Sequence, residues 1–370
     1  KMKKLVAMLL VFTMSISLAA CGGNKSSEST SGESKANEST VGDTKAAEEN
    51  TAASVENSGE PVSGGTVNIP ITDDPTTLQG WMLRNTNESA LAPAIYETLL
   101  RYDETGKPQP FLLESFEGDP EALTYTMVVR DGITFQDGTP LDAEAVKWNL
   151  DYYKENGVLT GSYFNYVESV EVVDDKTVVV HMSQWDALFD YGLARTCFIC
   201  SPTAVESLGV DGFNEMPVGT GAFKVTKWVH GEGIYTEKYD QYWQGTPYLD
   251  GVNFKIYAST ATQQAALEVG DLDIMNLTGD AITADALKAK GYSMSNAAIP
   301  STGYTLCFNS QADGPLKDLR VRQAIAYAVD TKAICDSLLG DGAYGTESTQ
   351  WAISSSAEYN SEVTGYDYDV

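Results

Sequence analysis

The chain has 370 residues, of which 52 are acidic and 24 are lysine or arginine, so its formal net charge at pH 7 is −28. Nucleic acid and anionic membrane surfaces would repel a chain this negative, which argues against both as partners. The length that remains after residue 63 is enough for two domains that each bury a hydrophobic core.

The N-terminal segment has the pattern of a signal peptide. Three lysines within the first four residues precede an apolar run over residues 5–16, which is too short to span a bilayer stably. The run leads to Leu18-Ala19-Ala20-Cys21, which resembles the lipobox of bacterial lipoproteins. That resemblance implies cleavage before Cys21 and a lipid anchor on it, and several acyl chains would hold the protein firmly. An ordinary secretory signal that happens to contain cysteine is the alternative.

Residues 22–63 are rich in Ser, Thr, Glu, Asn, Gly and Ala and hold no apolar side chain larger than valine. Such a segment cannot bury enough surface to offset the entropy of ordering it, so a disordered linker is predicted. As a flexible coil it would reach roughly 35 Å. The first two predicted regions are therefore a signal peptide at 1–21 and a linker at 22–63.

Hydrophobic periodicity, caps and turn residues predict the elements of the remaining chain. In chain order they are a strand at Thr66–Ile71, a helix at Glu88–Leu100, a strand at Leu123–Val129, a helix after the cap Asp142, a hairpin of Val167–Val173 and Lys176–Met182, a buried strand at Cys197–Cys200, a hairpin of Phe223–Trp228 and Ile234–Lys238, a strand at Val252–Tyr257, a helix at Thr260–Val269, strands at Asp273–Leu277 and Tyr304–Asn309, and a helix after the cap Asp318. This mixture predicts an α/β protein with mixed sheets.

Four cysteines follow the lipobox. Cys197 and Cys200 are spaced as in many metal sites, but no second CxxC or histidine pair completes one. Because they lie in an apolar run, we predict thiols buried in the core. Cys307 and Cys335 also lie in apolar runs, and the same prediction applies to them.

Six blocks in a fixed order carry a resemblance to a known family. They are Tyr96–Asp103 with Gly106-Lys107-Pro108, Val129–Phe135 with Asp137–Leu141, Pro217–Phe223, Asp240–Trp243, Gly270–Ile274, and Gly314–Asp318 with Val321–Ala324 and Ala328–Asp330. Together they resemble the family 5 extracellular solute-binding proteins, the oligopeptide-, dipeptide- and nickel-binding lipoproteins of ABC importers. The resemblance covers nearly everything from Gly64 to Val370.

The resemblance implies a type II periplasmic-binding-protein fold, in which two lobes with mixed sheets enclose a ligand in a cleft. The first lobe is expected over 64–300, with an extra subdomain inserted at about 91–184. The second lobe is expected over 301–370, with a hinge at Ser301–Tyr304. Residues 365–370 resemble the start of a further family block, so an incomplete second lobe is expected.

The resemblance also implies ligand-binding residues. Arg84–Asn87 roughly matches a loop that lines the ligand in peptide-binding members, and Tyr163 matches a tyrosine of the cleft. The expected set is Asn85, Thr86, Asn87, Tyr163, Thr220, Gly221, Tyr304 and Trp351. For each of them an ordinary surface or packing role is the alternative.

Catalysis has little support in the sequence. The two histidines, His181 in a predicted strand and His230 in a predicted turn, are not accompanied by GxSxG, HExxH, an EF-hand loop or a P-loop. Asp271 and Asp273 are interpreted as structural acids at a strand start. No enzyme activity, cofactor or metal is therefore expected.

The resemblance implies a lipid-anchored, extracytoplasmic receptor, expected to be a monomer, that captures short peptides and delivers them to an ABC permease and ATPase. Two alternatives stay open. The same fold could bind nickel, a sugar or another solute, or the protein could be a signalling or chaperone-like lipoprotein outside transport.

Overall fold

The computed structural model describes residues 61–83, 86–158, 160–295, 306–340, 342–345, 347–348, 350 and 359–369. All of them belong to one unit, Gly59–Val370. The signal peptide, with its lipidation site Cys21, and nearly all of the linker lie outside the described residues. No helix in the described part of the chain is both long and apolar enough to cross a membrane.

One sheet is mixed and joins the start of this unit to its middle. Its four strands are β1 (Thr66–Ile71), β8 (Phe223–Val229), β9 (Gly233–Lys238) and β10 (Gly251–Ile256), in the order β1-β10-β9-β8. β1 runs parallel to β10, whereas the β9 pairings with β10 and β8 are antiparallel. The strand predicted at Thr66–Ile71 and the predicted β8–β9 hairpin are confirmed.

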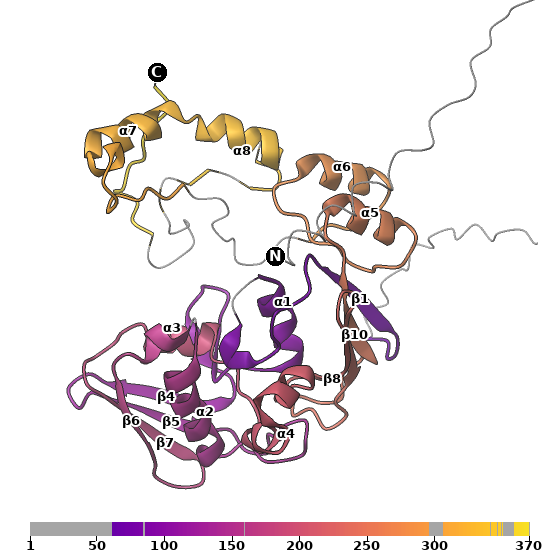
Figure 1. Ribbon diagram of the computed structural model, residues 1–370, viewed down its shortest axis with the longest axis vertical. Helices are drawn as coiled ribbons and strands as arrows, with labels where there is room; N and C mark the ends of the chain where they lie inside the picture. The colour runs from indigo at the N-terminus through magenta and orange to yellow at the C-terminus, as the bar shows by residue number, and fades with distance from the viewer. Residues whose placement is uncertain are drawn as a thin grey trace, which may run out of the picture. The chain divides into compact units, whose positions relative to one another are not determined.

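The second four-stranded sheet is antiparallel. Its strands are β4 (Leu113–Asp119), β5 (Thr124–Val129), β6 (Val167–Val172) and β7 (Thr177–Met182), in the order β4-β5-β7-β6. Helix α2 (Ala143–Asn156) packs against β6 and β7 (Figure 1). The side chain of Asp142 accepts a 2.9 Å hydrogen bond from the Ala145 amide, which confirms the predicted cap.

The other elements are shorter or lie outside the two sheets. The strands β2 (Leu100–Tyr102) and β3 (Pro108–Pro110) form a small ribbon. The helices are η1 (Gly80–Met82), α1 (Thr86–Ile95), η2 (Thr160–Phe164), α3 (Phe189–Arg195), α4 (Pro202–Glu215), α5 (Thr260–Glu268), α6 (Ala281–Ala289), η3 (Pro315–Lys317), α7 (Leu319–Ala328) and α8 (Thr331–Leu339). The predicted α5 and the predicted start of α7 after Asp318 are confirmed.

A single hydrophobic core connects the two sheets. Its fully or almost fully buried members include Ile71 in β1, Leu91 in α1, Val180 in β7 and Phe254 in β10. By contrast, no residue of α7 or α8 is buried. The division into lobes at 64–300 and 301–370, with a subdomain at about 91–184, stays a prediction.

The predicted helix Glu88–Leu100 is wrong at its C-terminal end, because α1 ends at Ile95. The Ile95 carbonyl accepts hydrogen bonds from the Gly221 amide at 2.9 Å and from Nε2 of Gln136 at 3.0 Å. In a longer helix this carbonyl would accept a bond from the Leu99 amide, and the tertiary contacts occupy it instead. The chain then turns and Leu100 begins β2 instead.

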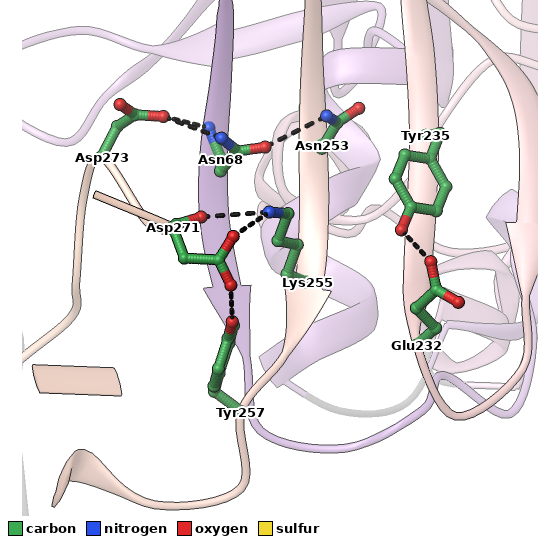
Figure 2. A network of polar contacts seen from close by, with 8 residues as sticks. All are labelled: Asn68, Glu232, Tyr235, Asn253, Lys255, Tyr257, Asp271 and Asp273. Carbon is green, nitrogen blue, oxygen red and sulfur yellow. Dashed lines mark hydrogen bonds and ion pairs between the residues drawn. The ribbon is translucent and has the colours of Figure 1, made fainter. Parts of the chain in front are cut away.

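The predicted strand Asp273–Leu277 is not formed. The Asp273 amide donates to the Asn68 carbonyl at 3.1 Å, and its side chain accepts from the Asn68 amide at 2.8 Å. Figure 2 shows this carboxylate beside Asn68 at the edge of the sheet. The next outward-facing residue of β1 is Pro70, which has no N–H to donate, so a regular ladder cannot continue. A strand is also expected at Tyr304–Asn309. Its described residues, 306–309, belong to no sheet.

The four cysteines divide into two kinds. Cys197 and Cys200 are fully buried free thiols, as predicted, although their segment forms only isolated bridges, between Phe198 and Thr98 and between Cys200 and Gly219. The prediction is wrong for Cys307, which is exposed, and for Cys335, which is half-exposed. Both of these lie in segments that do not pack into the hydrophobic core.

Candidate functional site

The carboxyl ends of the parallel strands β1 and β10 are the natural place to search for a site. In open α/β sheets, ligands bind outside the carboxyl ends of the strands. β1 ends at Ile71, and the following segment leads through residues 72–83 to the first residues of α1. The loop at this edge therefore decides which polar groups face a solute.

Three polar residues form a connected group at this edge. The Thr72 amide donates to Oδ1 of Asn87 at 3.2 Å, and Nδ2 of Asn87 donates to the Thr72 hydroxyl oxygen at 3.0 Å. Oδ2 of Asp73 lies 3.2 Å from the same hydroxyl. Thr72 and Asp73 are exposed, and Asp73 forms no ion pair with any described lysine, arginine or histidine. We call Thr72, Asp73 and Asn87 the β1-end group.

The next carboxylate along the chain is fully engaged in holding the loop. Oδ1 of Asp74 accepts from the Trp228 indole at 2.9 Å, and Oδ2 accepts from the Gly231 amide at 3.0 Å. Nδ1 of the His230 imidazole lies 3.2 Å from Oδ2, and the imidazole contacts the Trp228 ring at a tilt of 47°, with centroids 4.3 Å apart. Asp74 thus ties the loop after β1 to the β8–β9 turn.

A buried glutamate at the start of α1 fixes the middle of the same loop. Glu88 is fully buried, and its Oε1 accepts from the Thr76 hydroxyl at 2.6 Å and from the Thr76 amide at 3.1 Å. The Leu78 amide and the Thr77 hydroxyl both donate to Oδ1 of Asn214. Because Asp74 binds the β8–β9 turn, and Glu88 and Asn214 bind this loop, the β1-end group lies on a well-anchored backbone.

Thr220 and Gly221 lie at the other end of α1 and are used in packing. Thr220 is fully buried. A Cβ added to Gly221 would lie 2.6 Å from the carbonyl carbon of Ile95, so the missing side chain admits the backbone of α1 rather than a solute. Along the helix axis this point is about 12 Å from Asn87. The structure therefore does not bring Thr220 and Gly221 together with Asn87.

Gln136 holds this junction. Its Nε2 lies 3.0 Å from the Ile95 carbonyl, 2.9 Å from that of Gly221 and 2.8 Å from that of Phe223. Its Oε1 accepts from the Gly219 amide at 3.2 Å. A buried amide that serves several backbone groups stabilises the loop between α4 and β8.

Tyr163 lies in η2, against α3 rather than at the β1 end. It is half-buried, and a Cβ added to Gly192 of α3 would lie 2.4 Å from its Cγ atom. Close packing of this ring requires glycine at position 192. The role of Tyr163 in a cleft therefore stays a prediction. Asn85, Tyr304 and Trp351 lie outside the described residues, as does the side chain of Thr86.

The exposed acids Asp271 and Asp273 hold structure, as the sequence suggested. Oδ1 of Asp271 accepts from Nζ of Lys255 at 3.0 Å, and Oδ2 accepts from the Tyr257 hydroxyl. Figure 2 shows this contact, and also the chain of polar contacts from Asp273 through Asn68 to Asn253 across β1 and β10. Hydrogen bonds from Tyr257 and Lys255 hold the pKa of Asp271 below its usual range.

The histidines do not form a catalytic arrangement in the described part of the chain. His181 lies in β7 with its Nε2 3.0 Å from Glu171, on an exposed surface. His230 is bound to Asp74 as described above. Within the described ranges no three histidine, cysteine or acidic side chains are grouped as they would be around a metal ion.

Residue-by-residue analysis of the sequence missed Thr72 and Asp73. Their signal was weak: two polar residues directly after a strand, in a chain full of such positions. Only the parallel pairing of β1 with β10 shows that this strand end is an edge of the kind that binds ligands.

Comparisons with known proteins agree with this fold. AppA, an oligopeptide-binding protein from Bacillus subtilis solved with a nonapeptide, superimposes with a TM-score of 0.68 at 24% identity, covering 84% of this chain and 62% of AppA. NikZ from Campylobacter jejuni, solved with Ni(L-His), gives a TM-score of 0.68 at 22% identity, covering 82% of this chain and 60% of NikZ. The fold is that of type II periplasmic binding proteins, with mixed sheets.

Sequence comparison leads to the same family. The glutathione-binding protein GsiB of Salmonella paratyphi A is 31% identical over 264 residues, which are 70% of this chain and 51% of GsiB. The chain thus spans about half the length of the curated relatives it matches. The family model of the bacterial extracellular solute-binding proteins, family 5 Middle, matches residues 107–370. The chain therefore belongs to the family 5 bacterial extracellular solute-binding proteins.

Proposed function

We propose that this protein is the extracytoplasmic solute-binding component of an ABC importer, and that its solutes are short peptides. The observation that carries the proposal is the family match over residues 107–370. The relatives favour peptides, since GsiB is a glutathione-binding protein and AppA was solved with a nonapeptide. Glutathione is itself a modified tripeptide and is a concrete first candidate.

In this proposal the protein binds and releases a solute without breaking a bond. The two lobes, 64–300 and 301–370, close around the peptide about the hinge at Ser301–Tyr304. A peptide shifts this equilibrium only as far as it binds the closed state more tightly than the open state. The closed complex then docks on the permease and ATPase. No catalytic residue and no cofactor takes part.

The β1-end group is the part of the first lobe that we assign to the solute site. Thr72 and Asn87 offer hydroxyl and amide groups, and Asp73 offers a carboxylate, so the group suits a solute with exposed peptide amides. Asn85 and Thr86 continue the same loop. Tyr163, Tyr304 and Trp351 remain candidates for the rest of the cleft.

Delivery from outside the cell requires that the protein stay near its permease. We assign this task to a lipid anchor at Cys21 and to the linker at 22–63, so that a monomer moves within reach of the membrane without entering it. The strongly negative charge of the chain keeps the folded part away from anionic lipid.

Isothermal titration calorimetry of the full chain with glutathione and with di- to pentapeptides tests the proposal. We expect saturable binding that Asn87→Ala and Asp73→Asn each weaken by about tenfold, the loss expected from one or two polar contacts. Asn165→Ala, on the exposed turn after η2, is the matched control and should bind like the wild type. Absence of heat with every peptide would rule out peptides as the solute.

A metal chelate is the second candidate, because the neighbour NikZ was solved with Ni(L-His). Titration with nickel in the presence of histidine distinguishes the two. If the chelate binds and no peptide does, the chelate replaces peptides as the proposed solute. The proposed transport role would be unchanged. A signalling or chaperone-like role would be favoured if neither class of solute bound.

A further inference from the structure

An open groove runs beside α2, far in sequence from the β1-end group. Its volume is about 610 Å³, and its lining comes from the loop before α2, from one face of α2 and from the start of α4. From α2 the lining includes Glu144, Lys147, Trp148, Asp151, Tyr152 and Glu155. Nothing in the proposed transport function uses this surface.

The wall of the groove is a rigid aromatic stack. Trp148 and Tyr152 lie one helical turn apart with ring centroids 4.6 Å apart and planes at 18°. Tyr152 meets the buried Trp81 edge-on at 4.8 Å, and Trp81 stacks on the buried Phe213 at 5.3 Å. These four rings form a continuous series from the core to the groove. Trp148 is therefore held in place by its contact with Tyr152. Large aromatic side chains held rigidly at a surface are typical anchors of protein interfaces.

Carboxylates flank this stack along the helix. Glu144, Trp148, Asp151 and Glu155 are separated by four, three and four positions, which places them on one face over about 16 Å. Glu144 and Glu155 are exposed and form no ion pair in the described structure. The lining thus offers two uncompensated negative charges, one on each side of an aromatic ring.

The one cation of the lining does not neutralise these charges. Nζ of Lys147 donates to Oδ2 of Asp151 at 2.7 Å and to the Val170 carbonyl at 2.8 Å. Lys147 and Asp151 therefore satisfy each other. Asp142 uses its carboxylate to cap α2. What remains open to a partner is the Trp148–Tyr152 stack between Glu144 and Glu155.

We propose that this groove is an interaction surface for an arginine-bearing extended segment of a partner protein. A guanidinium group is flat, stacks on an indole face and pairs with carboxylates in a forked geometry. The ammonium group of lysine is not flat and does not form the forked pair. An extended segment advances about 3.3 Å per residue, so two arginines five residues apart match the spacing of Glu144 and Glu155. The groove is open along its length, which suits a chain segment better than a small cation that needs enclosure.

The test is a titration of the full chain with the capped peptide Ac-Arg-Gly-Ser-Gly-Ser-Arg-NH₂, followed by calorimetry and by the indole NMR signal of Trp148. We expect saturable binding and a shifted Trp148 signal. The double variant Glu144→Gln/Glu155→Gln should weaken binding at least tenfold, and replacement of both peptide arginines by lysine should weaken it several-fold. The matched control is Glu104→Gln/Glu121→Gln, which removes two exposed carboxylates outside the groove and should bind like the wild type.

Three results would overturn the proposal. They are the absence of a Trp148 shift at millimolar peptide, equal affinity of the groove variant and the control variant, and spermidine binding as tightly as the peptide, which would make the groove a site for small cations. Thermal unfolding of both double variants shows whether they keep the wild-type fold. Because the glutamines retain the shape of the exposed side chains, we expect melting temperatures close to that of the wild type.

Discussion

The indole N–H of Trp243 donates a 2.8 Å hydrogen bond to Oε2 of Glu97, a residue that is only 6% exposed. The Tyr242 hydroxyl donates to the other oxygen, Oε1, at 2.5 Å. Glu97 follows α1, whereas both aromatic residues follow β9, so these bonds join segments about 145 residues apart in the chain. Burial raises the pKa of Glu97, and the two hydrogen bonds partly oppose this rise.

Glu97→Ala should destabilise the fold. The change removes the buried acceptor of the half-buried Trp243 and Tyr242 donors and opens a cavity, so we expect a loss of about 2–4 kcal/mol in the free energy of unfolding. Glu97→Gln keeps the shape and one acceptor and should cost clearly less. Urea unfolding at pH 7 measures both. Equal losses for the two variants would show that the hydrogen bonds are not the source of stability.

The stability contribution of Glu97 should depend on pH. Its pKa in the folded state lies above the ordinary value of 4.5, so as the pH rises through that value the unfolded chain releases this proton first. Stability attributable to Glu97 is therefore present at low pH and falls until the pH has passed the folded-state pKa. The difference in unfolding free energy between Glu97→Gln and the wild type should shift in favour of the glutamine variant from pH 4 upward. A pH-independent difference would contradict the raised pKa.

Gly221→Ala should be poorly tolerated. The added Cβ would lie 2.6–2.7 Å from backbone atoms of Ala94 and Ile95, which cannot move aside as a side-chain tip can. We expect a loss of about 1–3 kcal/mol, the usual cost of overpacking. Gly161→Ala is the matched control, because no atom lies within 4 Å of its added Cβ. Thermal unfolding of the two variants side by side checks the difference.

The cysteines should differ in their reactivity with a maleimide. Cys307 is exposed and should be labelled first, and Cys335 more slowly. Burial raises the pKa of the Cys197 and Cys200 thiols far above the usual range, which keeps them protonated and unreactive. Time-resolved labelling with peptide mapping follows each thiol separately. Labelling of Cys197 or Cys200 in the native protein at the rate of Cys307 would show that this part of the core opens.

Cys21 should carry lipid when the chain is made in a bacterial host with its lipoprotein pathway. Mass spectrometry of the purified N-terminal peptide should show a mature chain that begins at Cys21 with acyl groups attached. Cys21→Ser should move the protein from the detergent phase to the aqueous phase in phase partitioning. An unmodified thiol at position 21 in the membrane fraction would remove the anchor from the proposal.

Local pattern was sufficient for most elements. The β6–β7 and β8–β9 hairpins and the capped helices α2, α5 and α7 agree with their predicted positions within a residue or two, because caps, turns and periodicity act over a few residues. The errors occur where a distant segment intervenes. Gln136 and Gly221 bind the Ile95 carbonyl where α1 ends, and Asp273 pairs with the edge of β1 through one amide and one carboxylate rather than through a strand.

The sequence by itself determined the family, since six ordered blocks are a linear property of the chain. The sequence also predicted Asn87 as a ligand-binding residue, but not which residues surround it. The tertiary structure decided that Thr72 and Asp73 join Asn87 at the end of β1, that Thr220 and Gly221 are packed against α1, and that Trp148 and Tyr152 line a groove with unpaired acids. The physical reason is that burial, hydrogen-bond partners and unpaired charge depend on which remote segments meet, and those meetings are fixed only when the sheets pair and the core closes.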